Sequence, residues 1–310
     1  MRTLIAIPVY NEETHLERVL ADMVKYSPEI LAVNDGSTDR SAALLDAHPF
    51  VEVHHHETNE GYGQSLIDAF AIAIHRRFDW IITLDADEQH DPAAIDMFLE
   101  AARGCDCDVV SGSRYLPGSS RETPVPEERR SINVLVSEIL ARVTPYRLTD
   151  AFCGFKAYRV AALERLHLAE KGYAMPLEFW VQAARCGLRV REVPVKLVYV
   201  DPSRTFRGPL DDPRVRLRHY LETIDRELAA WQAGTDDGLA CRVTEPKRRP
   251  AAGSRGGSPD LPRGGSGDPP RKSDSRGGSA DLPRGGSGDP PRKSRPVTPR
   301  SGATHPGAAP

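Results

Sequence analysis

Two aspartates one residue apart, Asp85 and Asp87, follow the apolar run at residues 80–84, which predicts a strand. Alternate residues of an extended chain share a face, so both carboxylates and the amide of Gln89 are predicted to lie in one row. Mg²⁺ and Mn²⁺ prefer such oxygen ligands and are often held by one or two carboxylates together with substrate phosphates. The sequence therefore predicts a site for Mg²⁺ or Mn²⁺ at Asp85, Asp87 and Gln89.

Three other segments have polar or flexible residues directly after a predicted strand or directly before a predicted helix. Residues 8–13 follow a buried strand, residues 34–39 follow a second one, and residues 59–64 precede a helix expected at 65–77. In an open α/β sheet, ligands bind outside the carboxyl ends of the strands. These segments are therefore expected to form one binding site with the two aspartates.

Together these four motifs resemble those of family 2 glycosyltransferases of the GT-A fold. The matching residues are Pro-Val-Tyr-Asn-Glu-Glu at 8–13, Asn-Asp-Gly-Ser-Thr-Asp at 34–39, Asn59 with Gly61 and Gly63, and Asp-Ala-Asp at 85–87 with residues 89–92. Within that family the chain is most similar to the dolichol-phosphate or polyprenyl-phosphate mannosyltransferase branch. The resemblance runs from about residue 3 to about residue 209.

The fold expected for residues 1–235 is a single α/β domain. Strands near 3–8, 30–34, 51–55, 80–85 and 108–113 alternate with helices, which predicts a mostly parallel sheet covered on both faces, as in the Rossmann-like GT-A fold. No G-x-G-x-x-G motif opens the first helix, which disfavours a dinucleotide-dependent dehydrogenase.

Residues 236–310 are expected to form a disordered tail. From residue 242 onward the chain holds 13 of its 25 glycines and 13 of its 26 prolines, with few large apolar side chains to offset the entropy of ordering. The segment at 254–262 returns at 275–283, a 21-residue repeat that we interpret as a duplication in a linker. The tail is basic, but we expect its charges to be solvated rather than to bind nucleic acid or lipid.

Cysteine use and hydropathy favour a cytoplasmic protein, free or peripheral at the inner face of the membrane. The five cysteines are odd in number and scattered, which we interpret as reduced thiols. No apolar run approaches the roughly 18–20 residues that span a bilayer, and no signal-peptide pattern is seen. The run His54-His55-His56 is interpreted as a solvated strand end, because neighbouring strand residues face opposite sides.

The resemblance assigns the nucleotide sugar to residues matching Pro8, Tyr10, Glu12, Asp35 and Asp85. Asp35 could accept a hydrogen bond from a base N–H, and Tyr10 could lie against the base or ribose. Both have simpler alternatives: Tyr10 as an aromatic packed at the sheet edge, and Asp35 as a turn-forming residue. Transfer places negative charge on the departing diphosphate, which a cation at Asp87 and Gln89 would neutralise.

Two arginines, Arg114 and Arg130, are predicted to bind the acceptor substrate. In the resembling branch, residues matching Arg114 and Arg130 hold the acceptor phosphate, a role that suits the planar donor fork of Arg. A phosphate acceptor needs no general base, consistent with the absence of a convincing catalytic histidine. Surface arginines are the alternative. Arg204 could reach the diphosphate, but residues 201–208 depart from the branch pattern.

Four later features remain open or only coarsely predicted. The apolar stripe at 132–143 fits either an interface or core packing, and Glu178 could be a base or a solvated helical residue. Residues 190–195 predict an edge strand, since a proline removes a ladder donor, and 213–231 predict a final helix.

The sequence thus predicts an inverting, metal-dependent hexosyltransferase that uses a GDP-mannose or UDP-glucose type of donor and a polyprenyl phosphate acceptor. One alternative is a hydroxyl acceptor in a cell-envelope polysaccharide or glycolipid. Another is a non-catalytic nucleotide-sugar-binding protein, which the joint presence of Asp85, Asp87 and Gln89 disfavours.

Overall fold

The computed structural model describes residues 1–27, 29–119, 126–196, 206 and 208–234. All of them belong to one compact unit, Met1–Lys247. The second unit, Arg248–Pro310, contains no described residue. Arg204, the domain boundary after residue 235 and the predicted disordered tail with its repeat lie outside the described residues.

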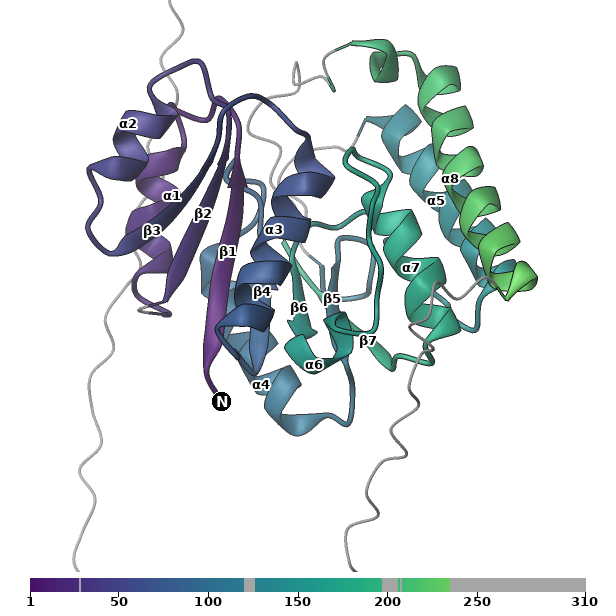
Figure 1. Cartoon of the computed structure of the whole chain (residues 1–310). Helices are drawn as coiled ribbons and strands as arrows, with labels where there is room; N and C mark the ends of the chain where they lie inside the picture. Colours follow the sequence, from purple (N-terminus) through teal and green to yellow (C-terminus); the bar gives the residue numbers. More distant parts are fainter. Residues whose placement is uncertain (28, 120–125, 197–205, 207, 235–310) are drawn as a thin grey trace, which may run out of the picture. The chain divides into compact units, whose positions relative to one another are not determined.

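The described strands form one seven-stranded sheet in the order β3-β2-β1-β4-β6-β5-β7 (Figure 1). Their bounds are β1 (Thr3–Val9), β2 (Ile30–Asp35), β3 (Val51–His56), β4 (Trp80–Thr83), β5 (Val109–Ser113), β6 (Lys156–Arg159) and β7 (Val190–Pro194). Every neighbouring pair is parallel except the two pairs that contain β6. The mostly parallel sheet predicted from the sequence is confirmed, and β7 is an edge strand as expected.

The direction of strand β6 determines which loop lies beside the carboxyl ends of the parallel strands. It lies antiparallel between β4 and β5, and its first residue, Lys156, pairs with Thr83 at the end of β4. The loop that precedes β6 therefore arrives at the edge where Asp85 leaves β4. The sequence alternation to residue 113 gives no signal for this reversal.

Helices cover both faces of the sheet, because alternate strand residues enter two separate cores. On β1, Ile5 and Ile7 pack with one group of helices, whereas Leu4 and Ala6 pack with the other. The first group is α1 (Leu16–Met23), α2 (Ser41–Asp46) and α4 (Ile95–Gly104). The second is α3 (Tyr62–His75), α5 (Glu127–Val143), α6 (Val160–Leu163), α7 (Met175–Arg185) and α8 (Pro213–Ala233). Two single turns of 3₁₀ helix, η1 (Pro92–Ala94) and η2 (Pro209–Asp211), complete the described elements.

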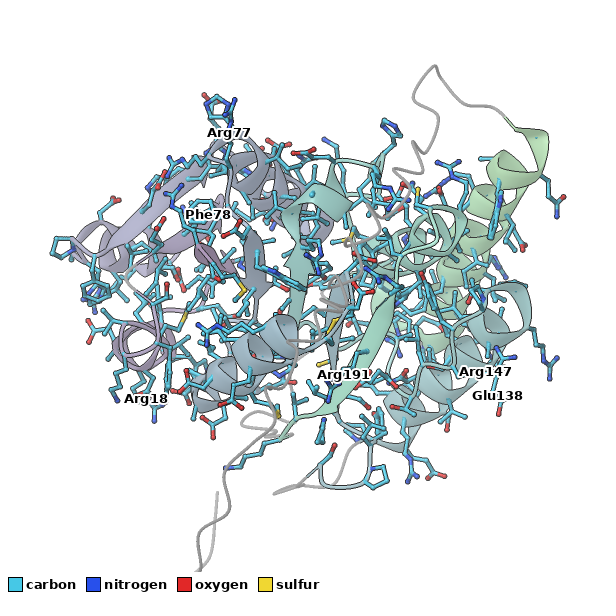
Figure 2. All side chains as sticks on the ribbon, turned by 90° about the horizontal axis from the view of Figure 1, so that it is seen from below. Arg18, Arg77, Phe78, Glu138, Arg147 and Arg191 are labelled. Carbon is cyan, nitrogen blue, oxygen red and sulfur yellow. A yellow bond between two sulfur atoms is a disulfide. The ribbon has the colours of Figure 1, made fainter. Side chains whose placement is uncertain are left out.

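The apolar stripe predicted at 132–143 is the greater part of α5, and most of it packs in the core. Val136 and Leu140 are fully buried, while Ile132, Ile139 and Val143 are partly buried against the same cluster. Charged residues such as Glu138 and Arg147 lie at the periphery (Figure 2). Core packing therefore accounts for this stripe except at Leu135, which is 41% exposed. No helix in the described part of the chain is long and apolar enough to cross a membrane.

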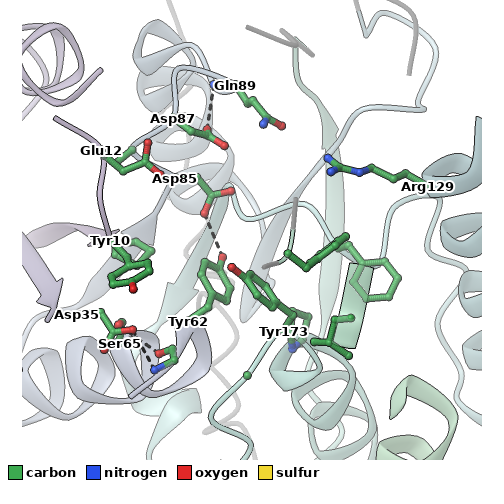
Figure 3. A pocket seen from close by; sticks show the side chains of 18 of the residues that line it. Tyr10, Glu12, Asp35, Tyr62, Ser65, Asp85, Asp87, Gln89, Arg129 and Tyr173 are labelled. Carbon is green, nitrogen blue, oxygen red and sulfur yellow. Dashed lines mark hydrogen bonds between the residues drawn. The ribbon is translucent and has the colours of Figure 1, made fainter. Parts of the chain in front are cut away.

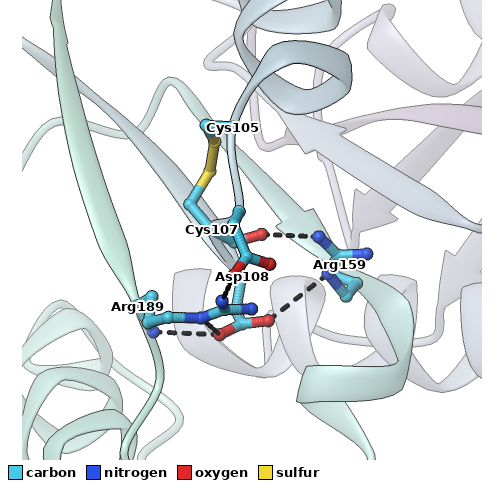
Figure 4. The surroundings of a disulfide bond; sticks show 6 residues. Cys105, Cys107, Asp108, Arg159 and Arg189 are labelled. Carbon is cyan, nitrogen blue, oxygen red and sulfur yellow. Dashed lines mark hydrogen bonds and ion pairs between the residues drawn. A yellow bond between two sulfur atoms is a disulfide. The ribbon is translucent and has the colours of Figure 1, made fainter. Parts of the chain in front are cut away.

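The expectation that the thiols are reduced is wrong for three described cysteines, Cys105, Cys107 and Cys186, which are disulfide-bonded, and it holds for Cys153. Cys105 and Cys107 form a disulfide where α4 ends and the chain runs into β5 (Figure 4). Residues two apart in extended chain face the same side, and here the Cα atoms are 5.3 Å apart, a distance that a disulfide can bridge. The pair precedes β5 and is therefore at the opposite end of that strand from the carboxyl edge.

Candidate active site

A pocket of about 860 Å³ lies at the carboxyl ends of β1, β2 and β4 (Figure 3). Two groups of lining residues define its halves. The acidic half consists of Pro8, Tyr10, Glu12, Asp35, Asp85, Asp87 and Gln89. The arginine half consists of Arg114, Arg129, Ile132, Phe152, Tyr173, Phe206, Arg216 and Tyr220. All seven residues of the acidic half are singled out by the sequence, and the structure brings them together.

Asp87 lies in a tight, well-supported turn. Its side chain is buried, and its Oδ1 accepts a hydrogen bond from the backbone N–H of Gln89 at 3.1 Å. Between them Glu88 has a φ of 59°, in the left-handed region that few non-glycine residues adopt. The Nε of Arg18 lies 2.8 Å from the Glu88 carboxylate and helps to hold that conformation. Such local strain is typical of functional sites.

Asp85 is fixed by contacts on both sides. The Tyr62 hydroxyl donates to its Oδ1 at 3.1 Å, and Gly154 lies so close that a Cβ there would be 2.4 Å from Oδ2. A side chain at 154, in the loop that β6 brings to this edge, would therefore displace the Asp85 carboxylate. Burial, and then the neighbouring Asp85, raise the pKa of Tyr62 well above its ordinary value, so its hydroxyl remains a donor at physiological pH.

Asp35 organises the loop at residues 59–61. Its carboxylate accepts the backbone N–H groups of Glu60 and Gly61 at 2.7 and 2.9 Å, and His56 Nδ1 lies 2.8 Å from Oδ1. The next residue, Gly36, has a φ of +63° and passes so near Thr58 that a Cβ would be 2.4 Å from its carbonyl carbon. Asp35 thus lines the pocket as predicted, and its carboxylate holds the 59–61 loop rather than a turn before Gly36, which was the simpler alternative.

The donor set of the acidic half fits a hard divalent cation. Asp85, Asp87 and Gln89 offer carboxylate and amide oxygens and no nitrogen or sulfur ligand, the chemistry that Mg²⁺ and Mn²⁺ prefer. Glu12, only 6% exposed, adds a further carboxylate to the same half.

Arg114 lines the pocket, but its guanidinium is engaged by a buried carboxylate. Its Nε and Nη2 lie 2.6 and 2.9 Å from the two oxygens of Asp150, which also accepts from Asn133 Nδ2 at 2.8 Å. Burial acts to raise the pKa of Asp150, but the Arg114 guanidinium holds it below its ordinary value. Arg114 therefore braces this half of the pocket through Asp150.

Arg129, and not Arg130, lines the pocket. The sequence motifs predict Arg130 near the metal site, but that residue is exposed and is not among the lining residues. Successive residues on a helix point about 100° apart, so a shift of one position moves an arginine from the pocket to the solvent side. Figure 3 shows Arg129 across the pocket from the carboxylates.

Arg129 belongs to a cationic and aromatic cluster that the sequence did not reveal. Its guanidinium carbon lies 5.3 Å from the centre of the Phe206 ring, and that of Arg216 lies 4.4 Å from the same ring. Arg216 is only 3% exposed, donates to the Leu210 carbonyl at 2.7 Å and pairs with Glu128. Arg216 lies on the buried face of α8, and the sequence alone does not show which face of that helix is buried.

Two segments beside the pocket, residues 61–64 and residues 170–172, are in direct backbone contact. The N–H of Gln64 donates to the Lys171 carbonyl at 3.1 Å, and a Cβ at Gly63 would lie 2.2 Å from the carbonyl oxygen of Glu170. Beyond this contact the rings of Tyr62 and Tyr173 stack with centres 5.8 Å apart. We call this the 61–64/170–172 contact.

Glu178, considered as a base or a solvated residue, is neither solvated nor part of the pocket lining. It is 2% exposed, and its Oε2 accepts the backbone N–H groups of Ala169 and Glu170 at 3.0 and 2.9 Å. Burial raises its pKa. Its structural role is to hold the segment that leads into the 61–64/170–172 contact.

Comparison with known proteins gives a consistent set of relatives. Residues 4–167, just over half of the chain, match the family model described as Glycosyl transferase family 2. The chain is 33% identical to the undecaprenyl-phosphate mannosyltransferase of Micrococcus luteus over 207 residues, which cover 64% of this chain and 84% of that protein. It is 30% identical to the polyprenol monophosphomannose synthase of Mycolicibacterium smegmatis over 204 residues, 63% of this chain and 76% of that one.

Among solved structures, the fold resembles glucosyl-3-phosphoglycerate synthase from Mycobacterium tuberculosis in complex with Mn²⁺, uridine diphosphate and glucosyl-3-phosphoglycerate. The TM-score is 0.58 at 17% identity, over 74% of this chain and 80% of that chain. At this identity the likeness concerns the fold alone.

Proposed function

The chain belongs to family 2 of the glycosyl transferases and has the GT-A fold, and on that premise we propose that it transfers a hexosyl unit from a nucleoside diphosphate sugar to a polyprenyl phosphate. The donor is of the GDP-mannose or UDP-glucose type. The names of the two bacterial relatives, both of which specify mannosyl products and polyprenyl phosphates, support the acceptor. We propose that the protein works at the cytoplasmic face of the membrane as a peripheral protein.

One observation carries this proposal: a single pocket joins a half lined by four carboxylates to a half lined by three arginines and several aromatic rings. The acidic half suits a cation and the nucleotide sugar. The arginine half suits an anion through Arg129, because Arg offers several donors in a fixed fork that matches phosphate geometry. Arg114 and Arg216 are held by Asp150 and Glu128 and add positive charge around it. A donor diphosphate and an acceptor phosphate could therefore meet at the boundary between the halves.

In the proposed mechanism, Asp87 with Asp85 and Gln89 would hold Mg²⁺ or Mn²⁺. When bound, the cation supplies positive charge that neutralises the diphosphate as it leaves. Asp35 keeps the 59–61 loop in place for the nucleoside, and Tyr62 keeps Asp85 oriented. These residues hold their positions before the substrate arrives, so little reorganisation is needed during the reaction.

On the acceptor side, Arg129 positions the lipid phosphate, with Arg216 beside it. A phosphate oxygen attacks the anomeric carbon, the bond from that carbon to the diphosphate oxygen breaks, and the nucleoside diphosphate leaves with the electron pair. Because attack comes from the face opposite the leaving group, the anomeric configuration inverts. A phosphate monoester has a second pKa near 6, so the nucleophile is already ionised at neutral pH and needs no base.

The apolar side chains of the arginine half would accommodate the first part of a lipid chain. Ile132, Phe152 and Tyr220 line it together with Phe206. A polysaccharide acceptor would have less use for such a surface. This wall favours a lipid-linked acceptor over a hydroxyl group of a cell-envelope polysaccharide, and the relatives' names favour a polyprenyl phosphate over a glycolipid.

A transfer assay with an arginine pair tests the proposal. The full chain is assayed with GDP- and UDP-sugars, Mg²⁺ or Mn²⁺, and polyprenyl phosphate, and Arg129→Ala is compared with its neighbour Arg130→Ala. We expect Arg129→Ala to raise the acceptor KM about tenfold or more, the scale of a lost charge-assisted hydrogen bond, with the donor KM unchanged. Arg130→Ala, exposed and outside the pocket, should behave as wild type.

Two results would contradict the proposal. Equal transfer to an unphosphorylated polyprenol would move the acceptor to a hydroxyl group. A product whose anomeric configuration matches that of the donor would exclude the single displacement.

A further inference from the structure

A second set of metal-ligand side chains lies on the edge strand β3 and the facing helix α3, outside the pocket lining. His54 and His56 from β3 and Asp68 from α3 have ligand atoms that all lie within 4.8 Å of one another. His56 is buried, Asp68 is partly buried and His54 is exposed, so the cluster opens to solvent on one side. We propose that these three residues bind a divalent transition-metal ion of the Zn²⁺ type.

The backbone explains why two of the three histidines converge. Consecutive strand residues face opposite sides, which is why the run is expected to be solvated, but His54 and His56 are two apart and share a face. Their rings are 5.4 Å apart, whereas His55 turns away to Asn34 and Asp46. The interpretation of a solvated strand end holds for His54 and His55, both exposed, and not for His56.

The ligand spacing suits a tetrahedral ion. The Nε2 of His56 is hydrogen-bonded to Oδ2 of Asp68 at 3.0 Å, a contact that a bound ion would replace. Two ligands of a tetrahedral zinc ion, each about 2.0–2.1 Å from the metal, lie about 3.3 Å apart, so an ion would need only a small separation of this pair. His54 supplies the third ligand, and its exposure leaves the fourth position to water.

His56 and Asp68 already have the outer partners that metal ligands require. Asp35 Oδ1 lies 2.8 Å from His56 Nδ1, which leaves Nε2 of that ring as the ligand atom. The amide nitrogen of Gln64 donates to both carboxylate oxygens of Asp68 at 3.1 Å. Metal-bound histidine usually donates its other ring N–H to a carboxylate or carbonyl in this way.

The ligand chemistry separates this site from the one proposed at Asp87. Two imidazoles and one carboxylate favour Zn²⁺, Co²⁺, Ni²⁺ or Cu²⁺, whereas the all-oxygen set in the pocket favours Mg²⁺ or Mn²⁺. The two sites are nevertheless linked through Asp35, which contacts His56 and also accepts the amides of Glu60 and Gly61. An ion on His56 would fix the ring and thereby stabilise the nucleotide loop.

Calorimetric titration of the full chain with Zn²⁺, in excess Mg²⁺ to fill the hard-ligand site, tests the proposal. We expect one Zn²⁺ per chain, with affinity reduced about tenfold or more in His54→Ala and in Asp68→Asn. His55→Ala, in the same run but on the other face, should stay within about twofold of wild type. Absence of saturable binding, or an equal loss in His54→Ala and His55→Ala, would overturn the site.

Hydrogen exchange gives a second readout that does not depend on glycosyl transfer. Saturating Zn²⁺ should slow amide exchange at Glu60 and Gly61 in the wild type and leave it unchanged in His54→Ala. If Zn²⁺ binds at the three residues but exchange at both amides stays the same, the link to the nucleotide loop is refuted.

Discussion

The acidic half and the arginine half of the pocket are built in different ways. In the acidic half, short side chains at strand ends are held by backbone or hydroxyl donors: two amides and a ring nitrogen contact Asp35, an amide contacts Asp87 and Tyr62 contacts Asp85. In the arginine half, long side chains from helices surround Phe206. The first arrangement fixes atoms through local geometry, whereas the second depends on packing between distant elements.

The largest effect should come from the carboxylate that braces the arginine half. Asp150→Asn removes the partner of the buried Arg114 and leaves a charge unpaired, which should lower the free energy of unfolding by about 3–5 kcal/mol. Urea unfolding measures this, with the exposed Asp106→Asn as a control expected within about 0.5 kcal/mol of wild type. A small effect of Asp150→Asn would show that this half does not depend on one ion pair.

The pH dependence of that loss has a defined direction. The pKa of Asp150 is held below its ordinary 3.8, so its stabilisation is complete above about that pH and is lost as the pH falls through the native value. The difference between wild type and Asp150→Asn should therefore be constant near neutrality and shrink below about pH 3.8. A difference that grows in acid would contradict the ion-pair interpretation.

Within the acidic half, Asp87 should matter most for turnover. Asp87→Asn keeps the size of the side chain but removes the charge proposed to hold the cation, and kcat should fall roughly 10²–10³-fold with the fold intact. Asp96→Asn, exposed on α4 and outside the pocket lining, is the matched control. Unchanged turnover in Asp87→Asn at saturating metal would remove Asp87 from the cation site.

Gly154→Ala tests whether the acidic half depends on the loop before β6. The new methyl group would meet the Asp85 carboxylate, with the Cβ 2.4 Å from Oδ2, and should move it and reduce kcat about tenfold. Gly104→Ala, where a Cβ meets nothing within 4 Å, should leave activity and stability near wild type. Full activity in Gly154→Ala would mean that the position of Asp85 is not critical.

The smallest effect is expected at Tyr62. Tyr62→Phe removes one hydrogen bond to Asp85, worth about 0.5–1.5 kcal/mol, and should slow transfer about 2- to 10-fold. Tyr26→Phe, away from this pocket, is the control. A much larger loss at Tyr62 would assign its hydroxyl a direct contact with substrate.

The sequence predicts the acidic half well and the arginine half poorly, for a physical reason. Strand ends are marked locally by a change from apolar to polar residues, so the order of residues along the chain is enough to place Asp35, Asp85 and Asp87 on the same edge. Which face of α5 enters the pocket depends on how that helix packs against its neighbours, and an error of one residue exchanges Arg129 for Arg130.

The remaining misses have the same origin. The reversal of β6 is set by how distant strands pair, and nothing near residues 156–159 encodes it. The structural role of Glu178 matches neither of the two roles considered for it, because its partners, the amides of Ala169 and Glu170, come from a loop that only the folded chain brings close. Arg204, proposed to reach the diphosphate, lies outside the described residues and stays a prediction.

The 61–64/170–172 contact has a kinetic consequence. Because backbone meets backbone there, a shift of the donor loop cannot be absorbed by a side-chain rotamer and must be passed to Tyr173. We therefore expect the substrates to add in a fixed order, donor first, rather than at random. Initial-rate patterns with a dead-end acceptor analogue would reveal this: uncompetitive inhibition against the donor fits ordered addition, and noncompetitive inhibition against the donor rules it out.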